Sequence, residues 1–273
     1  MKRNVIFVIV GLLVLSLALG GCTSKSAPDK TSDRETVLKV GATPVPHAEI
    51  LNFIKPKLEK EGIKLEVIEF TDYVKPNLAL NEKEIDANFF QHVPYMESFA
   101  RERGIDMISV GKVHVEPLGL YSKKLESIDD LGDGAVIAIP NDPTNEGRAL
   151  ILLEANGIIK LSEEAGLEAT EKDIVENPKN IVFKPIDAAQ LPRTLEDVDA
   201  SIINTNYALE AKLNPTKDAL IVEGSESPYA NVVTVRPEDK DNKNIKKLVE
   251  ALQSEDVKKF IEEKYKGAIV PAF

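Results

Sequence analysis

Apolar residues follow two patterns along most of this chain. From about residue 37 onward, short β-branched and aliphatic runs alternate with stretches in which apolar side chains recur every three or four positions. The runs are typical of buried strands, and the spaced pattern is typical of helices that pack along one face. Their alternation predicts an α/β fold with a largely parallel sheet. In the first half, the predicted strands are 37–42, 65–70, 86–91 and 107–113, and the predicted helices are 46–61 and 93–103.

A second series of similar size begins near residue 135. Its predicted strands are 135–140, 180–183, 200–204 and 232–235, and its predicted helices are 143–156, 188–197, 207–213 and 244–265. Two series suggest two lobes, with crossings near 114–121 and 228–234. We expect lobe 1 to contain 37–117 and 232–273, and lobe 2 to contain 118–231. A cleft between lobes is a common place for a small-molecule site.

The first residues differ from the rest. A basic start is followed by an apolar run from Val5 to Leu19 and by Gly20, Gly21 and Cys22. This order predicts a signal peptide at 1–21, with Cys22 as a lipidated first residue and 22–36 as a flexible tether. The alternative is a single uncleaved membrane anchor. The run is shorter than the ~20 residues that a spanning helix needs, which favours the signal peptide.

Composition removes several classes of function. The net charge is −11, and no basic cluster stands out, which argues against a nucleic-acid partner. Cys22 is the only cysteine, so neither an internal disulfide nor a cysteine nucleophile is expected in the fold. Motifs of zinc proteases, serine hydrolases and phosphate-binding loops are absent from the sequence. We therefore expect no enzyme activity and no cofactor.

The three histidines leave one alternative open. His47, His92 and His114 could meet around a metal ion, as in zinc-binding transport proteins. They lack tight ligand spacing, and the chain has no histidine-rich segment. The metal-binding hypothesis is therefore the weaker one.

The segment IPNDPTNEGRAL combines a strand end with a helix start. Asp142 is a plausible N-cap, and Pro143 suits the first helical position. Asn145 and Arg148 lie three residues apart and share a helix face. An arginine beside a helix N-terminus makes a good carboxylate site, because the guanidinium offers two parallel donors. The alternative is an exposed arginine on a surface helix.

Three asparagines follow or precede predicted strands. Asn204 and Asn206 come just after one strand, and Asn231 comes just before another. An asparagine oxygen can accept a hydrogen bond from a ligand ammonium group. Capping a helix or forming a turn is the alternative role.

Aromatic residues are scarce, at 5% of the chain, yet three lie within ANFFQHVPY. Phe90 and His92 are two positions apart, so on a strand they face the same side. Tyr95 follows a turn at Pro94, and Tyr73 follows another predicted strand. By periodicity alone these residues belong to a core more often than to a pocket wall.

Several long motifs occur in order after the lipidation signal. They are EFTDYVKPNLAL, DANFFQHVPYM, AIPNDPTNEGRALILLE, AAQLPRTLEDVDASIINTNYA and ESPYANVVTVR. Together they resemble the methionine-binding lipoproteins, the substrate-capture subunits of bacterial methionine ABC importers. The resemblance extends from about Leu38 to the C-terminus. It implies a two-lobed periplasmic-binding-protein fold, type II-like, with the ligand cleft between the lobes.

The resemblance also implies roles for residues that match its motifs. Arg148 and Asn145 would hold the ligand carboxylate, and Asn206 and Asn231 would take the ammonium group. The wall of the side-chain pocket would be formed by Tyr73, Phe90, His92 and Tyr95. Phe90 rather than Phe89 should face the ligand, because it shares the strand side of His92. A shift of register by one or two residues would bring in Phe89 and Asn204 instead.

The expected function is capture of L-methionine by a lipid-anchored protein on the extracytoplasmic side of a membrane. The expected partners are the membrane and ATPase subunits of an ABC importer. The sequence leaves D-methionine, a dipeptide or another apolar amino acid open as the ligand, because one methylene changes discrimination by only about 1–3 kcal/mol.

Overall fold

The computed structural model describes residues 36–224 and 227–273. The predicted signal peptide, Cys22 and nearly all of the predicted tether lie outside the described residues. Within the described part of the chain, we find no helix with the length and apolar character that crossing a membrane requires.

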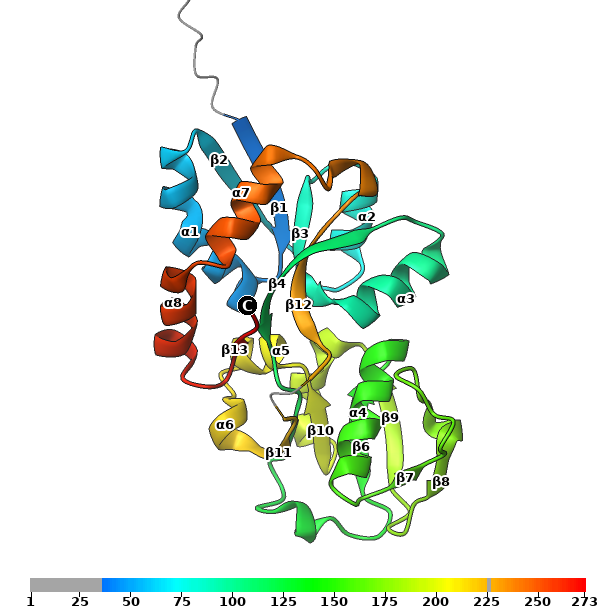
Figure 1. The fold of residues 1–273 in the computed structure, drawn as a ribbon. Helices are drawn as coiled ribbons and strands as arrows, with labels where there is room; N and C mark the ends of the chain where they lie inside the picture. The colour runs from blue at the N-terminus through cyan, green and yellow to red at the C-terminus, as the bar shows by residue number, and fades with distance from the viewer. Residues whose placement is uncertain (1–35, 225–226) are drawn as a thin grey trace, which may run out of the picture. The chain divides into compact units, whose positions relative to one another are not determined.

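The first sheet has six strands in the order β13-β4-β12-β3-β1-β2 (Figure 1). Their bounds are β1 Thr36–Ala42, β2 Ile63–Glu69, β3 Ala87–His92, β4 Ile108–Val115, β12 Ala230–Val235 and β13 Val270–Pro271. Strand β1 is parallel to β2 and β3, but β12 is antiparallel to both β3 and β4. The four strands predicted in the first half of the chain, β1 to β4, thus run in one direction as expected, whereas β12 and β13 run against them. The chain returns from the second lobe at the edge of the sheet where β4 left it, so β12 runs against its neighbours.

Helices cover both faces of this sheet. Figure 1 shows α1, α7 and α8 on one side and α2 and α3 on the other. Their bounds are α1 Glu49–Lys60, α2 Lys75–Asn81, α3 Val93–Arg103, α7 Lys243–Leu252 and α8 Glu255–Tyr265, with short turns η1 Pro44–Ala48 and η5 Pro237–Asp239. The predicted single helix 244–265 is wrong, because Ser254 adopts an extended conformation (ψ 154°) and starts a new helix.

The second sheet has five strands in the order β11-β5-β10-β6-β9. Their bounds are β5 Gly119–Tyr121, β6 Val136–Pro140, β9 Val182–Ile186, β10 Ala200–Ile203 and β11 Ala219–Val222. Its helices are α4 Pro143–Ala155, α5 Thr205–Glu210 and α6 Pro215–Asp218, with η2 Ile128–Asp130, η3 Glu171–Asp173 and η4 Ala188–Glu196; a separate hairpin contains β7 Lys160–Leu161 and β8 Ile174–Glu176. The short elements α2, β5 and β11 were not predicted, since each spans too few residues to show a clear period.

The two sheets divide the chain near the expected crossings. Residues after β4 lead into the second sheet, and residues before β12 lead back to the first. Strand β12 already begins at Ala230, so Asn231 lies in the first sheet although we had placed it at the end of lobe 2.

Successive residues of β3 point to opposite sides of the first sheet. Phe89 packs in the core under α1, α7 and α8. Phe90 packs in a separate cluster that includes residues of α2 and α3. This alternation is the strand period of two. Because of it, the ring of Phe90 lies on the side of the sheet on which α3 begins.

At Gly147, helix α4 packs tightly against the backbone of residues 167–169. A methyl group at this position would lie 2.3 Å from the carbonyl oxygen of Leu167 and 2.8 Å from the backbone nitrogen of Ala169. Backbone atoms cannot move aside cheaply. We expect Gly147→Ala to lower the free energy of unfolding by about 1–3 kcal/mol, although alanine is the better helix former. Urea denaturation measures the change.

Gly132→Ala is the matched control. A methyl group there meets no atom within 4 Å. Its effect should stay within about 0.5 kcal/mol. Equal effects of the two substitutions would contradict the proposed backbone clash.

Candidate functional site

A narrow cavity lies between residues of the two sheets. All eight residues predicted for the site line this cavity: Tyr73, Phe90, His92, Tyr95, Asn145, Arg148, Asn206 and Asn231. Four further lining residues were not in that set: Gln91, Glu116, Asn204 and Thr205. Phe89 does not line it, in agreement with the register argument.

Arg148 is buried, with 3% of its surface exposed. Its Nε donates to Glu223 Oε1 at 3.0 Å, and its Nη2 donates to the other oxygen of Glu223 and to the carbonyl oxygen of Glu116 at 2.7 Å. The guanidinium also lies over the ring of Tyr229, 4.3 Å from the centroid. These bonds use three of the five N–H groups of an arginine.

The occupied donors change one expectation. We had assigned the parallel donor pair of Arg148 to a ligand, but Glu223 takes the Nε and Nη2 edge. The Nη1 nitrogen has no hydrogen-bond partner among the described residues. Its two N–H groups are therefore the ones left for an anion in the cavity.

Asn145 organises the start of α4. Asp142 is the N-cap, as predicted, and accepts from the backbone N–H of Asn145 at 3.0 Å. The side-chain Nδ2 of Asn145 also donates to Asp142. Its Oδ1 accepts from Asn204 Nδ2 at 2.8 Å and from His92 Nε2 at 3.3 Å. The amide is thus occupied by protein groups and positions two other cavity residues.

Two buried amide atoms at the cavity have no partner among the described residues. They are Asn204 Oδ1, an acceptor, and Asn206 Nδ2, a donor. The side-chain oxygen of Asn206 accepts a hydrogen bond from Tyr73 OH at 2.6 Å, and this bond joins the two lobes. Leaving a buried polar atom unpaired costs about 1–3 kcal/mol. Both atoms therefore favour a ligand that carries both a donor and an acceptor.

Aromatic rings form the apolar part of the wall. The ring centroid of Tyr73 lies 5.9 Å from that of Phe90 and 5.8 Å from that of Tyr95. The hydroxyl of Tyr95 donates to the carbonyl oxygen of Tyr73 at 3.0 Å, which fixes the two rings relative to each other. Burial raises the pKa of both tyrosine hydroxyls, so they remain neutral donors.

His92 caps helix α3. Its Nδ1 accepts from the backbone N–H of Tyr95 at 3.2 Å, so Nε2 carries the proton that it donates to Asn145. Burial, and then the nearby positive charge of Arg148, lower the pKa of this ring to about 3. His92 is therefore a neutral wall residue at physiological pH.

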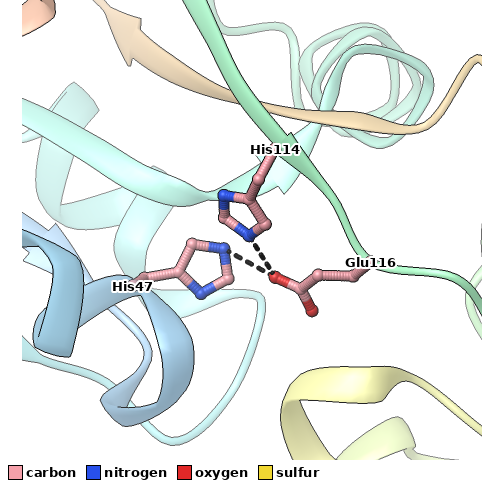
Figure 2. Close-up of side chains that lie close together, drawn as sticks. All are labelled: His47, His114 and Glu116. Atoms are coloured by element: carbon pink, nitrogen blue, oxygen red, sulfur yellow. Dashed lines mark hydrogen bonds and ion pairs between the residues drawn. The ribbon is translucent and has the colours of Figure 1, made fainter. Parts of the chain in front are cut away.

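A polar cluster lies beside the cavity. Figure 2 shows His47 and His114 pointing toward one oxygen of Glu116. Their Nε2 atoms lie 3.1 Å and 2.7 Å from Glu116 Oε1, and all three residues are buried. Among the described residues, this is the group with spacing that could hold a metal, and His92 is not part of it. The three-histidine arrangement that we considered is therefore not formed.

The residues that sequence reasoning missed gave only weak signals. Glu116 is one of 45 acidic residues, and it lies in a segment that was interpreted as a crossing. Glu223 and Tyr229 border the second crossing, where periodicity carries no information about side-chain direction. The available hint was that two polar residues, His114 and Glu116, lie close to the end of a strand, where ligand sites are often found.

Sequence comparison places the chain in a family. The profile of the family described as NlpA lipoprotein matches residues 38–273. This chain belongs to the NlpA lipoprotein family. The D-methionine-binding lipoprotein MetQ of Salmonella typhimurium is 43% identical over 266 residues, which cover 97% of this chain and 96% of MetQ. The resemblance to methionine-binding lipoproteins is thereby confirmed.

Solved structures of similar proteins share the fold. A nutrient-binding protein from Burkholderia cenocepacia, bound to methionine, is 51% identical with a TM-score of 0.84, and the match covers 86% of this chain and 100% of that one. A periplasmic substrate-binding protein of an ABC transporter from Coxiella burnetii is 44% identical with a TM-score of 0.83, at 86% and 100% coverage. The predicted two-lobed α/β fold of this NlpA lipoprotein is confirmed.

His92 gives this NlpA lipoprotein a specific pH dependence. The pKa of this ring is about 3 in the folded protein and 6.5 in an unfolded chain. At pH values between the two, the ring is protonated in the unfolded state and neutral in the folded state. Acid therefore favours unfolding as the pH falls from 6.5 toward 3. At pH 5 we expect a cost of about 2 kcal/mol from this ring. Denaturation of the wild type and of His92→Gln at pH 7 and pH 5 isolates the contribution of this ring. Between pH 7 and pH 5, the free energy of unfolding should fall less in the variant than in the wild type.

NMR spectra of the ring provide the direct check. The ring signals of His92 should keep their neutral positions down to pH 5. A titration midpoint near 6.5 would contradict the buried neutral ring.

Proposed function

We propose that this protein captures L-methionine, or a close analogue, between its two lobes and delivers it to an ABC importer. The observation that carries the proposal is the charge pattern of the cavity. Among the described lining residues, Arg148 is the one cation and Glu116 the one carboxylate, and neutral polar side chains and aromatic rings form the rest of the wall. A zwitterion with an apolar side chain matches that combination. No bond is made or broken in such a role, so no enzyme activity is proposed.

The ligand carboxylate is proposed to face Arg148. The two N–H groups of Nη1 remain for it, and Asn206 Nδ2 is a second donor without a partner among the described residues. Asn145 supports this end of the cavity indirectly, since it holds Asn204 and His92 in place. A charge-assisted bond from a buried guanidinium is stronger than a neutral one.

The ligand ammonium is proposed to face amide oxygens. Asn206 Oδ1 and Asn231 Oδ1 each accept one bond from the protein, from Tyr73 and His47 respectively, and each retains a lone pair. Asn204 Oδ1, which has no partner among the described residues, is the third acceptor.

The thioether is proposed to lie among Tyr73, Phe90, His92 and Tyr95. Sulfur is polarizable and makes favourable contacts with aromatic rings, worth about 0.3–1.5 kcal/mol each. Because these contacts depend little on stereochemistry at the α-carbon, the wall alone does not choose between L- and D-methionine. The relative from Salmonella typhimurium is named for D-methionine, so both enantiomers belong in the test.

The first residues of the chain support a proposal about its location. We propose that 1–21 is a signal peptide and that Cys22 is lipidated. The lipid would hold the protein on the extracytoplasmic side of a membrane, near the membrane and ATPase subunits of the importer. The proposed lobes are 37–117 with 230–273, and 118–229, moved by two residues to keep β12 whole.

Arg148→Ala tests the carboxylate assignment. We expect L-methionine affinity to fall by roughly 30-fold to several thousand-fold, because removing one partner of a buried charged contact costs about 2–5 kcal/mol. Calorimetry should use protein that has been unfolded and refolded to remove retained ligand. Mass spectrometry of the material released on unfolding identifies that ligand independently.

Arg101→Ala is the matched control. Arg101 also pairs with a glutamate, Glu168, at 2.6 Å, but its side chain is 61% exposed and does not line the cavity. Its loss should leave affinity unchanged. Retained affinity in Arg148→Ala would contradict the carboxylate assignment. Heat from zinc without heat from either methionine enantiomer would favour the metal-binding alternative instead.

A further inference from the structure

Glu116 is the least expected member of the cavity wall. It follows β4, is 6% exposed, and is the one carboxylate among the described lining residues. Burial raises its pKa, and the neighbouring His47 and Arg148 oppose that rise. A buried carboxylate is costly unless its oxygens are hydrogen-bonded and its charge is met by a cation. The hydrogen-bond partners of Glu116 therefore indicate whether the protein stabilises the ionised or the protonated carboxyl group.

Both neighbouring imidazoles approach Glu116, but they bond differently. The Nε2 of His47 donates its one N–H to Asn231 Oδ1 at 3.1 Å and lies in close contact with Glu116 Oε1, also at 3.1 Å, so the proton is on Nε2. Its Nδ1 then accepts from the hydroxyl of Thr43 at 2.7 Å. His114 donates from Nε2 to the same carboxylate oxygen at 2.7 Å. Burial lowers the pKa of His47 to about 4 and that of His114 to about 3, so both rings are neutral at physiological pH.

Counting lone pairs leaves a position open on Oε2. Oε1 accepts one bond, from His114 Nε2 at 2.7 Å, and His47 Nε2 lies in close contact with it at 3.1 Å. Oε2 accepts one bond, from the backbone N–H of Asn206 at 3.1 Å. A carboxylate oxygen has room for about two donors. One acceptor position on Oε2 therefore remains, on a residue that lines the cavity.

We infer that Glu116 is the anionic partner of the ligand's ammonium group, and that His47 and His114 are positioning residues that hold its carboxylate ionised. Two neutral N–H donors, from His114 and from the backbone of Asn206, stabilise the anion without cancelling its charge, so the charge remains for a cation in the cavity. The inference deepens the proposed function and rests on it. The amides then supply hydrogen bonds to the ammonium, and Glu116 supplies the opposite charge.

A metal ion is the competing explanation of the same cluster. The three residues offer ligand atoms within 4.8 Å of one another. Ligands about 2.0–2.2 Å from a tetrahedral zinc ion lie roughly 3.3 Å apart. The contacts of 2.7 Å and 3.1 Å to Glu116 are shorter than that separation, and the shorter one is a direct hydrogen bond from His114. The distances therefore favour imidazole N–H groups facing the carboxylate over a metal ion between the three residues.

The experiment compares two ligands that differ only in the ammonium group. They are L-methionine and 4-(methylthio)butanoate, which keeps the carboxylate and the thioether. Wild type should prefer L-methionine strongly. In Glu116→Gln, which keeps the shape and removes the charge, we expect that preference to fall at least about 10-fold, with the affinity for 4-(methylthio)butanoate changed by less than about 3-fold. Titration calorimetry measures both affinities.

The positioning role has its own pair of variants. His47→Gln keeps an N–H donor near the position of Nε2, whereas His47→Leu removes it. We expect the leucine variant to lose part of the preference for L-methionine and the glutamine variant to retain most of it. Because both variants remove the imidazole, a merely structural role of the ring would affect them alike. This pair also keeps the test valid if thermal unfolding shows that Glu116→Gln does not fold.

Each contrary outcome has a separate meaning. Equal weakening of both ligands in Glu116→Gln would overturn the inference and leave Glu116 as a structural residue. Stoichiometric zinc in refolded wild type after exposure to zinc, lost in His47→Leu, would overturn it in favour of a metal site. Failure of wild type to bind either methionine enantiomer would instead overturn the proposed function.

Discussion

The burial of the Arg148 guanidinium is the constraint on which the cavity depends. A guanidinium cannot lose its proton in a protein, so its partners must be supplied by the fold. Glu223, the carbonyl oxygen of Glu116 and the ring of Tyr229 supply them. All three partners lie in the two segments that connect the lobes, so the arginine of α4 ties both connections to one point. Its Nη1 nitrogen has no hydrogen-bond partner among the described residues, and Arg148 lines the cavity.

A chain of amides extends this order across the cleft. Asp142 fixes Asn145, whose oxygen receives bonds from Asn204 in the second lobe and from His92 in the first. Tyr73 donates to an amide on the opposite lobe in the same way. In a buried amide side chain the oxygen accepts and the nitrogen donates. Each bond in the chain therefore determines which atom of the next amide remains without a hydrogen-bond partner. The oxygen of Asn204, which has no partner among the residues that the structure describes, is a consequence of this chain of bonds.

The sequence predicted the elements whose signals are local. Asp142 and Pro143 mark a helix start through backbone chemistry that needs no distant partner, and the structure has that helix and cap. The period of two in β3 likewise separates Phe89 from Phe90. Pairing direction has no local signal, which is why the antiparallel insertion of β12 was not foreseen. The break at Ser254 was missed because apolar spacing continues across it, although the backbone does not.

Eight of the twelve lining residues were predictable from motif resemblance, whereas Glu116 and the hydrogen bonds of the cavity were not. Motif resemblance locates Arg148 and Asn145, but which N–H faces a ligand depends on competitors that lie far away in sequence. Glu223 takes the donor edge that spacing alone assigns to a ligand. Glu223 pairs with Arg148, and among the described residues Glu116 has no ion pair with a lysine or arginine, although Arg148 is close enough to oppose the rise of its pKa. On the roles that we propose, the ammonium group of the ligand faces Glu116 and its carboxylate faces Arg148, so recognition depends on both ends of the amino acid.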